Sequence, residues 1–178
     1  MMLAINRSDT RTSQHLKVNS GVFGDGDVIP EEFSDYDHGA SFPLAWSDGP
    51  VGTRSYAVLV EDPDVRKAPV PFSHWVVWNI PVHANHLPRG VPSRGMLDDP
   101  SGAHQGATSM GNVGYFGPRP PAGDPAHHYH VQVFAVDRVL ELPSGADRDA
   151  LVAAIAGHVL ASGELVGTFE RAVSARSP

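Results

Sequence analysis

The sequence contains four side chains whose types would suit a small polar pocket: Asp62, His74, His127 and Tyr129. Imidazole and phenol groups can donate hydrogen bonds, and a carboxylate can accept them. A phosphate or carboxylate ligand would therefore suit the two histidines and the tyrosine. Asp62 would keep one histidine protonated or meet a cationic part of the ligand, as in an ethanolamine phosphate. Taken singly, Asp62 also fits a capped turn before Pro63, and His74 fits a core histidine bonded to a backbone carbonyl.

The order of the histidines around Tyr129 separates two hypotheses. Side chains alternate between the faces of a strand, so His127 and Tyr129 would share one face, and His128 and His130 the other. The first pair favours an anion pocket. The second pair, with a third ligand such as His74, would suit a metal-dependent enzyme with a β fold, since imidazole is a common metal ligand. The residues by themselves leave both hypotheses open.

A hydrolase that pairs Ser73 or Ser109 with a histidine is a third hypothesis. The sequence has no G-x-S-x-G motif to place a nucleophilic serine on a strand-to-helix turn. In a regular strand Ser73, Trp75 and Val77 would share one face. His74, Val76 and Trp78 would share the other. The side chains of Ser73 and His74 would then point apart, which argues against a dyad.

Apolar segments predict the strands that would position these groups. They are Arg54–Glu61, His74–Ile80, Tyr129–Asp137 and Glu164–Arg171, with a shorter strand at Leu16–Val18 and a turn at Gly24–Asp27. Arg54–Glu61 is apolar on both of its alternating faces, which indicates a strand covered on both sides. His74–Ile80 is rich in β-branched and aromatic residues, and Pro81 ends it.

The remaining segments predict one helix and several loops. Leu151, Ile155 and Val159 repeat at four-residue steps, which predicts a helix over Asp147–Ala161 that Gly163 would end. Val82–Gly114 has little periodicity and is expected to be a long loop. Met1–Ser13 is expected to be a flexible arm. The predicted fold is therefore mainly β, with a long loop region and a helix in the C-terminal half.

The composition is typical of a globular protein and excludes several functions. The 178 residues, 41% of them hydrophobic, would fill one domain spanning 1–178. A formal net charge of −7 without a basic run argues against nucleic-acid binding. The absence of cysteine excludes disulfides and thiolate chemistry. No apolar run resembles a signal or a membrane span, so a cytoplasmic protein without an integral membrane segment is expected.

The segment Gly117–Pro125 would form a stiff wall beside the histidine run. It contains four prolines and two glycines, so it has few backbone donors and permits close backbone approach. It leads directly into the predicted strand that carries His127 and Tyr129.

Taken together and in order, these segments resemble the phosphatidylethanolamine-binding protein family, which includes the Raf kinase inhibitor proteins, and most of all its bacterial and archaeal branch. The resemblance extends over roughly residues 15 to 171. Five motifs carry it: Gly39-Ala-Ser-Phe-Pro-Leu-Ala-Trp46, Asp62-Pro-Asp64, His74-Trp-Val-Val-Trp-Asn-Ile-Pro81, Gly114-Tyr-Phe-Gly-Pro-Arg-Pro-Pro121 and His127-His-Tyr129.

The resemblance implies a Greek-key β-sandwich with a pocket for phosphate-type groups and phospholipid headgroups. Its ligand-binding residues would be Asp62, His74, Pro120, Pro121, His127 and Tyr129. It implies no metal, no organic cofactor and a binding role rather than an enzymatic one. It also allows a homodimer and a protein partner whose activity the protein would modulate.

Four parts of the sequence depart from the family pattern. The usual Asp-Pro-Asp-Ala-Pro continues here as Asp62-Pro-Asp-Val-Arg66, so one pocket proline is absent or replaced by Pro69. Phe72 stands where tryptophan is usual, and Phe169 where tyrosine is usual. Arg119 stands where a small residue is common, and it would add a cation at the rim of the pocket or close it.

Overall fold

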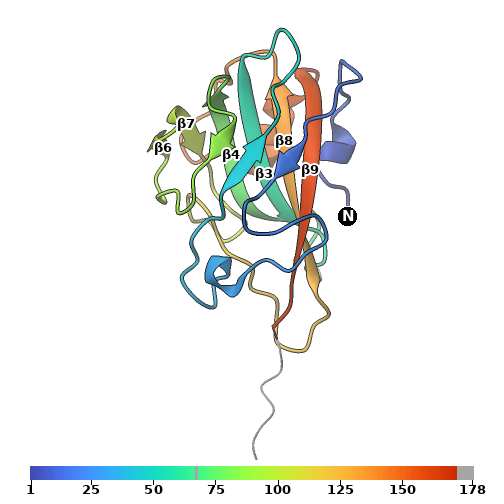
Figure 1. The fold of residues 1–178 in the computed structure, drawn as a ribbon, viewed down its shortest axis with the longest axis vertical. Coiled ribbons are helices and arrows are strands. Elements are labelled where there is room, and N and C mark those ends of the chain that lie inside the picture. The colour runs from blue at the N-terminus through green and yellow to red at the C-terminus, as the bar shows by residue number, and fades with distance from the viewer. Residues whose placement is uncertain (67, 172–178) are drawn as a thin grey trace, which may run out of the picture.

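The computed structural model describes residues 1–66 and 68–171 and shows a mainly β protein with two antiparallel sheets (Figure 1). The six-stranded sheet has the order β6 (Met96–Asp98), β7 (Ser101–Gln105), β4 (Phe72–Pro81), β3 (Ser55–Asp62), β8 (His127–Val136), β9 (Val159–Phe169). The three-stranded sheet has the order β1 (Val18–Asn19), β2 (Leu44–Trp46), β5 (His86–Leu87). Among the described residues the helices are α1 (Arg148–Ile155) and the 3₁₀ turns η1 (Ile5–Arg7) and η2 (Glu31–Phe33).

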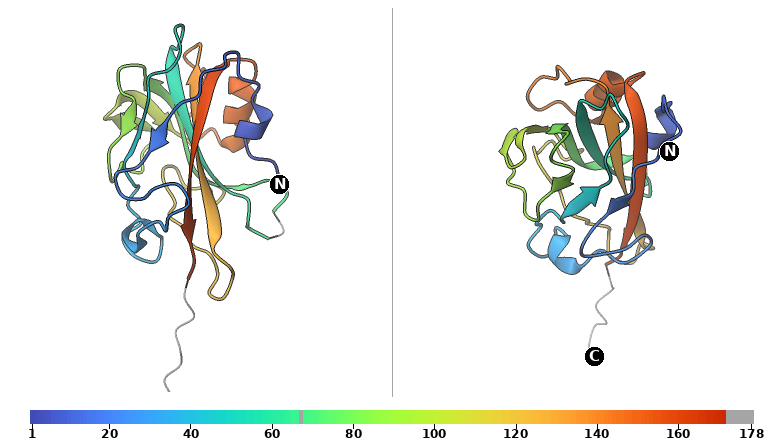
Figure 2. Two further views of the ribbon diagram at one scale, coloured as in Figure 1. Left: turned by 45° about the vertical axis from the view of Figure 1, so that its right-hand side comes forward. Right: turned by 45° about the horizontal axis from the view of Figure 1, so that its top comes forward.

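The strand order within the large sheet is that of a Greek key. β3, β4 and β7 follow one another across the sheet, and β8 returns by a long connection to lie on the other side of β3. The connection from β7 to β8 passes through residues 106–126 and reaches the end of the sheet opposite α1 (Figure 2). This connection contains the proline-rich segment, so the topology itself brings that segment to the end of β8.

The large sheet is buried on both faces. Between the two sheets, Trp75 and Val131 of the large sheet pack in one cluster with Trp46 of the small sheet. On the other face, α1 and the N-terminal segment cover Trp78 and Phe134 (Figure 2). Every residue of β3 is buried, in agreement with its two-sided apolar sequence.

The mainly β fold and its three central strands are confirmed. The predictions over Arg54–Glu61, His74–Ile80 and Tyr129–Asp137 correspond to β3, β4 and β8 within two residues at each end. The fourth predicted strand, Glu164–Arg171, is the second half of a longer strand, β9, which ends at Phe169.

The predicted helix Asp147–Ala161 is too long. α1 ends at Ile155, because Gly157 adopts a positive φ of 75° and the chain then enters β9. Val159 continues the helical spacing in the sequence, but in the structure it pairs with Val136 in the sheet. The start was correct, since the Asp147 side chain accepts a hydrogen bond from the Ala150 N–H and caps the helix.

Two segments that were expected to be irregular are partly ordered by the sheets. Val82–Gly114 contains β5, β6 and β7, so it is not a continuous loop. Met1–Ser13 packs against the rest of the protein and is not a flexible arm. Ala4 is fully buried, and the N–H groups of Arg11 and Thr12 donate to the carbonyl groups of Val159 and Leu160.

Candidate functional site

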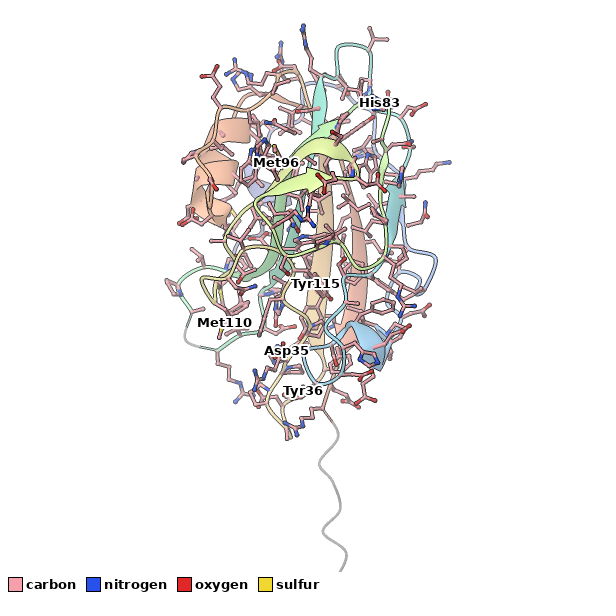
Figure 3. The ribbon with its side chains drawn as sticks, turned by 90° about the vertical axis from the view of Figure 1, so that its left-hand side faces the viewer. Asp35, Tyr36, His83, Met96, Met110 and Tyr115 are labelled. Carbon is pink, nitrogen blue, oxygen red and sulfur yellow. The ribbon has the colours of Figure 1, made fainter. Side chains whose placement is uncertain are left out.

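A cavity of about 410 Å³ lies where β3, β4 and β8 meet the proline-rich connection. All six residues that the family resemblance assigned to ligand binding line it, although they come from distant parts of the chain. Met110, which also lines it, lies near the lower end of the molecule in Figure 3, toward Asp35 and Tyr36 and away from His83 and Met96. The lining residues are Asp62, Val65, Arg66, Phe72, His74, Met110, Phe116, Arg119, Pro120, Pro121, Asp124, His127 and Tyr129.

An irregularity in β4 directs His74 into this cavity. Val60 of β3 pairs with Trp75, but the next residue, Glu61, pairs with Ser73, so one extra residue is inserted in β4. Such a bulge shifts the alternation of side chains. His74 therefore lies on the same face as Trp75, where its ring meets that of Tyr129 at 5.0 Å. The expected grouping of His74 with Val76 and Trp78 was wrong, because it assumed a regular strand.

Ser73 lies on the opposite face from His74, as the sequence indicated. Its hydroxyl lies 3.1 Å from that of Ser109, and both line a separate hollow beside Arg148. A serine–histidine dyad at Ser73 is therefore not formed, because the neighbouring side chains of Ser73 and His74 point to opposite faces; the bulge changes only the face of Trp75 relative to His74.

Asp62 and His127 form a buried pair at the base of the cavity. His127 Nδ1 lies 2.7 Å from Asp62 Oδ2, and the two residues are 5% and 1% exposed. The other carboxylate oxygen, Oδ1, accepts the Asp64 N–H at 2.7 Å. The Asp62 carboxylate is thus fixed from both sides, and it holds the His127 ring in one orientation.

His74 is held by both backbone groups of Phe116. Its Nδ1 lies 2.8 Å from the Phe116 carbonyl oxygen, and its own carbonyl accepts the Phe116 N–H at 2.8 Å. Burial lowers the pKa of His74 to about 4, although the hydrogen bond to Phe116 and the nearby charge of Asp62 oppose the shift. His74 is therefore a neutral imidazole at physiological pH.

Tyr129 brings an unsatisfied hydroxyl to the cavity. The residue is 1% exposed, and its Oη has no hydrogen-bond partner among the described residues. Burial raises the pKa of the phenol far above its ordinary value, and the charge of Asp62 adds to the effect, so the hydroxyl stays protonated. A buried polar atom without a partner is uncommon in proteins and costly to keep.

The wall made by Pro120 and Pro121 is anchored to the segment after η2. The Tyr36 hydroxyl donates to the Pro120 carbonyl at 2.6 Å, and the Arg119 guanidinium donates to the Asp35 carboxylate at 2.8 Å. Figure 3 shows Asp35 and Tyr36 together at this end of the molecule. The Arg119 side chain is therefore a cation at the rim, and it does not close the cavity.

Close packing fixes the start of this wall at Gly117. A Cβ atom there would lie 2.5 Å from the Asp35 nitrogen and 2.6 Å from the Phe33 carbonyl oxygen. Only glycine fits such an approach of two backbones.

Several lining residues were not singled out as ligand contacts from the sequence. Met110, Phe116 and Val65 give the cavity an apolar side, and Asp124 and Arg66 add opposite charges to it. The proximity of Phe116 to the wall prolines was a usable signal. Met110 gave none, since it stands in a segment without periodicity and reaches the cavity only through tertiary packing.

His128 and His130 do not form the metal site of the alternative hypothesis. They face away from the cavity, as strand alternation predicted, and each bonds an acid: His128 to Asp64 at 2.8 Å and His130 to Glu164 at 2.9 Å. Within residues 1–66 and 68–171, no three His, Cys, Asp or Glu side chains are grouped closely enough to hold a metal ion. The arrangement gives the metal-enzyme hypothesis no support.

The fold and the cavity define a β-sandwich protein with a polar site at one end of its large sheet. The chain belongs to the phosphatidylethanolamine-binding protein family, whose sequence pattern matches residues 19–170. None of the helices in the described part of the chain has the length and apolar character needed to span a bilayer.

Known proteins resemble the chain over most of its length. A UPF0098 protein of Pyrococcus horikoshii is 41% identical over 156 residues, which cover 88% of this chain and 77% of the relative. A Mycobacterium tuberculosis protein named as lipoprotein LppC is 36% identical, with 89% of this chain and 74% of the relative covered. The crystal structure of YbcL from Escherichia coli, described as a member of the mammalian family, superposes with a TM-score of 0.80 at 29% identity, covering 89% of this chain and 99% of YbcL.

Proposed function

We propose that the protein binds an anionic, phosphate-bearing small molecule or a phospholipid headgroup in the cavity lined by Asp62, His74, His127 and Tyr129. The observation that carries the proposal is the buried Tyr129 hydroxyl, which has no partner in the described part of the chain and lies at the cavity wall. A ligand oxygen would satisfy it. The guanidinium groups of Arg66 and Arg119 add charge-assisted donors at the rim.

The same cavity disfavours a bare anion. Asp62 and Asp124 place two carboxylates in its lining, and a ligand with only negative charge would be repelled by them. A ligand that also carries a positive or protonated group, such as phosphoethanolamine, matches both signs. The apolar side formed by Phe72, Met110 and Phe116 would pack against the rest of such a ligand.

Family membership supports three further parts of the proposal. A binding protein of this kind would modulate a partner protein, would act without catalysing a reaction, and would form a homodimer. We also propose that residues 1–178 act as one domain and that the protein is cytoplasmic. Light scattering of the purified protein tests the dimer. Cell fractionation tests the location. Recovery in the membrane fraction would contradict the proposal, and it is the alternative to test because the mycobacterial relative is named as a lipoprotein.

Titration of the full chain with inorganic phosphate and with phosphoethanolamine tests the binding proposal. The ring signals of His74 and His127 in NMR spectra should shift with a saturable response. His127→Ala and Asp62→Ala should abolish the response because they remove the buried pair at the cavity base. His128→Ala is the matched control, since this exposed histidine of the same strand faces away from the cavity. Loss of the response in His128→Ala alone would contradict the proposed site.

A further inference from the structure

The sequence suggested that both histidines of the cavity would donate hydrogen bonds to a ligand. Their hydrogen bonds in the structure indicate otherwise. His74 Nδ1 lies 2.8 Å from the Phe116 carbonyl oxygen, and a carbonyl oxygen can only accept a hydrogen bond. The proton of the neutral ring is therefore on Nδ1, and Nε2 carries a lone pair. His74 Nε2 makes no hydrogen bond to a described residue, and the ring lines the cavity. Instead of a donor, this histidine presents an acceptor.

His127 also has its Nδ1 atom bonded to an acceptor, which in this case is the Asp62 carboxylate. Its Nδ1 lies 2.7 Å from Asp62 Oδ2, and a carboxylate is also only an acceptor. When the ring carries one proton, that proton is therefore on Nδ1 and Nε2 is an acceptor. Its Nε2 lies 3.7 Å from Asp124 Oδ2, which is outside hydrogen-bond distance. The cavity thus has the imidazole acceptor of His74 and, with a singly protonated His127 ring, a second one, in addition to two carboxylates.

We infer that the cavity selects anions that carry a hydrogen-bond donor of their own, an inference that rests on the proposed anion-binding function. The hydroxyl of Tyr129 and the guanidinium groups of Arg66 and Arg119 can donate to the oxygens of the anion. No described residue donates to either Nε2 atom, so a ligand that brings a hydrogen of its own would satisfy them. An anion without one would leave buried acceptors unpaired and would face the charges of Asp62 and Asp124.

The donor can come from two sources with the same chemistry. One is the O–H of a hydrogen phosphate group. The other is the N–H of an ethanolamine headgroup attached to the phosphate. Sulfate, which is tetrahedral like phosphate but carries no hydrogen near neutral pH, has neither.

The structure also supplies a substitution that should reverse this selectivity. The Asp64 N–H donates to Asp62 Oδ1, so this position must remain an oxygen. In Asp62→Asn the amide nitrogen must then occupy the Oδ2 position, where it donates to His127 Nδ1. The proton of the His127 ring would move to Nε2 and point into the cavity. One acceptor would become a donor, and sulfate would be accepted.

The first test compares phosphate with sulfate by calorimetry on the full chain at about pH 8, well above the ordinary histidine range. Both are tetrahedral dianions there, and only hydrogen phosphate carries an O–H. Sulfate should bind at least about tenfold more weakly, which is the scale of one unpaired buried acceptor. A second pair, phosphoethanolamine and phosphocholine, has equal charges, but only the former has N–H groups.

The two pairs separate the sources of the donor. Discrimination in the second pair assigns the donor to the headgroup, and discrimination in the first pair alone assigns it to the phosphate O–H. Equal binding within both pairs would overturn the inference and leave the proposed function intact. Failure of all four compounds to bind would remove the proposed function itself.

The variant test uses the ratio of the two affinities, because Asp62→Asn keeps the hydrogen bonds that hold His127, unlike Asp62→Ala, but removes a negative charge and so changes the affinity for both anions. In Asp62→Asn the preference for phosphate over sulfate should fall toward one. Asp64→Asn, which removes the same charge two residues away, should keep the preference of the natural chain. An unchanged preference in Asp62→Asn would overturn the inference. Should that variant not fold, nitrogen-15 shifts of the natural protein decide: a neutral His74 or His127 ring with its proton on Nε2 would overturn it as well.

Discussion

Glu61 and Asp62 are consecutive acids at the end of β3, and both are almost fully buried, at 0% and 1% exposure. They lie on opposite faces of the sheet. Glu61 faces α1 and the N-terminal segment, and Asp62 faces the cavity. Two neighbouring carboxylates with equal burial therefore belong to regions with different roles.

Both carboxylate oxygens of Glu61 have hydrogen-bond partners in the surrounding region. One carboxylate oxygen accepts the Ala4 N–H at 2.8 Å and the Gln132 amide at 2.7 Å, and the other accepts the guanidinium of Arg148. The Gln132 carbonyl in turn accepts the Ile5 N–H at 2.7 Å. A fully satisfied buried network of this kind holds the N-terminal segment and α1 on the sheet and offers nothing to a ligand.

The region around Asp62 leaves part of its capacity unused. The carboxylate is satisfied, but the Tyr129 hydroxyl and the Nε2 atom of His74 have no hydrogen-bond partner among the described residues. The comparison shows that burial of charge does not distinguish a structural network from a binding site. What distinguishes them is the polar capacity left over at a cavity.

The largest effect is expected on the Glu61 side. Arg148→Leu leaves the Glu61 carboxylate buried without its cation, which should lower the free energy of unfolding by about 3–5 kcal/mol. Urea denaturation followed by tryptophan fluorescence measures it. Glu61→Leu combined with Arg148→Leu should recover much of the loss, because no buried charge then remains unpaired. A loss below about 1 kcal/mol in Arg148→Leu would show that the network is not structural.

The next effect is a pH dependence of stability from the Asp62 side. His74 has its pKa lowered from 6.5 to about 4 by burial, so the unfolded chain binds the proton more readily than the folded one. Stability should fall as the pH drops from 6.5 to 4, by roughly 3 kcal/mol from this group. Urea denaturation across this range measures the slope. His74→Gln should reduce it, and an identical slope in that variant would contradict the assignment.

A smaller and opposite pair of effects is expected for two buried tyrosines. The Tyr115 hydroxyl donates to the Phe33 carbonyl at 2.9 Å, so Tyr115→Phe should cost about 1–2 kcal/mol of unfolding free energy. Tyr129→Phe removes an unsatisfied hydroxyl and should leave stability unchanged or raise it by up to about 1 kcal/mol. Calorimetry should show that only Tyr129→Phe weakens phosphate binding, by about tenfold. Equal losses of stability in the two variants would erase the distinction between the regions.

The smallest effect is expected outside both regions. His128 and Asp64 form an exposed pair at 2.8 Å, and exposed ion pairs contribute little. His128→Ala should change the unfolding free energy by less than about 0.5 kcal/mol in urea denaturation. A change above about 1 kcal/mol would mean that the outer face of β8 is more than a solvated surface.

Much of the fold could be predicted because the signals are local. The two-sided apolar sequence of β3 and the aromatic run of β4 specify strands wherever they pack. The segment that forms β6 and β7 gave no such signal, since it is rich in glycine and polar residues. This segment forms strands because β7 pairs with Val77 and Trp78 of β4. That pairing depends on a strand more than twenty residues away in the sequence.

The end of α1 shows the same limit. Val159 satisfies the helical spacing of Leu151 and Ile155, so the sequence pattern includes it in the helix. Its long-range pairing with Val136 assigns it to β9. The local spacing of apolar residues does not show that a strand more than twenty residues away will pair with Val159 and keep it out of the helix.

For the site, the sequence by itself determined which chemical groups are available and which face of β8 each histidine occupies. The tertiary structure decided the direction of His74, because a bulge depends on how two strands pair. It also decided which hydrogens reach the cavity: the partners that hold the Nδ1 protons, Phe116 for His74 and Asp62 for His127, come from remote segments. Residue types fix how many hydrogen bonds a side chain can make, and only the arrangement of its neighbours fixes which of them remain for a ligand.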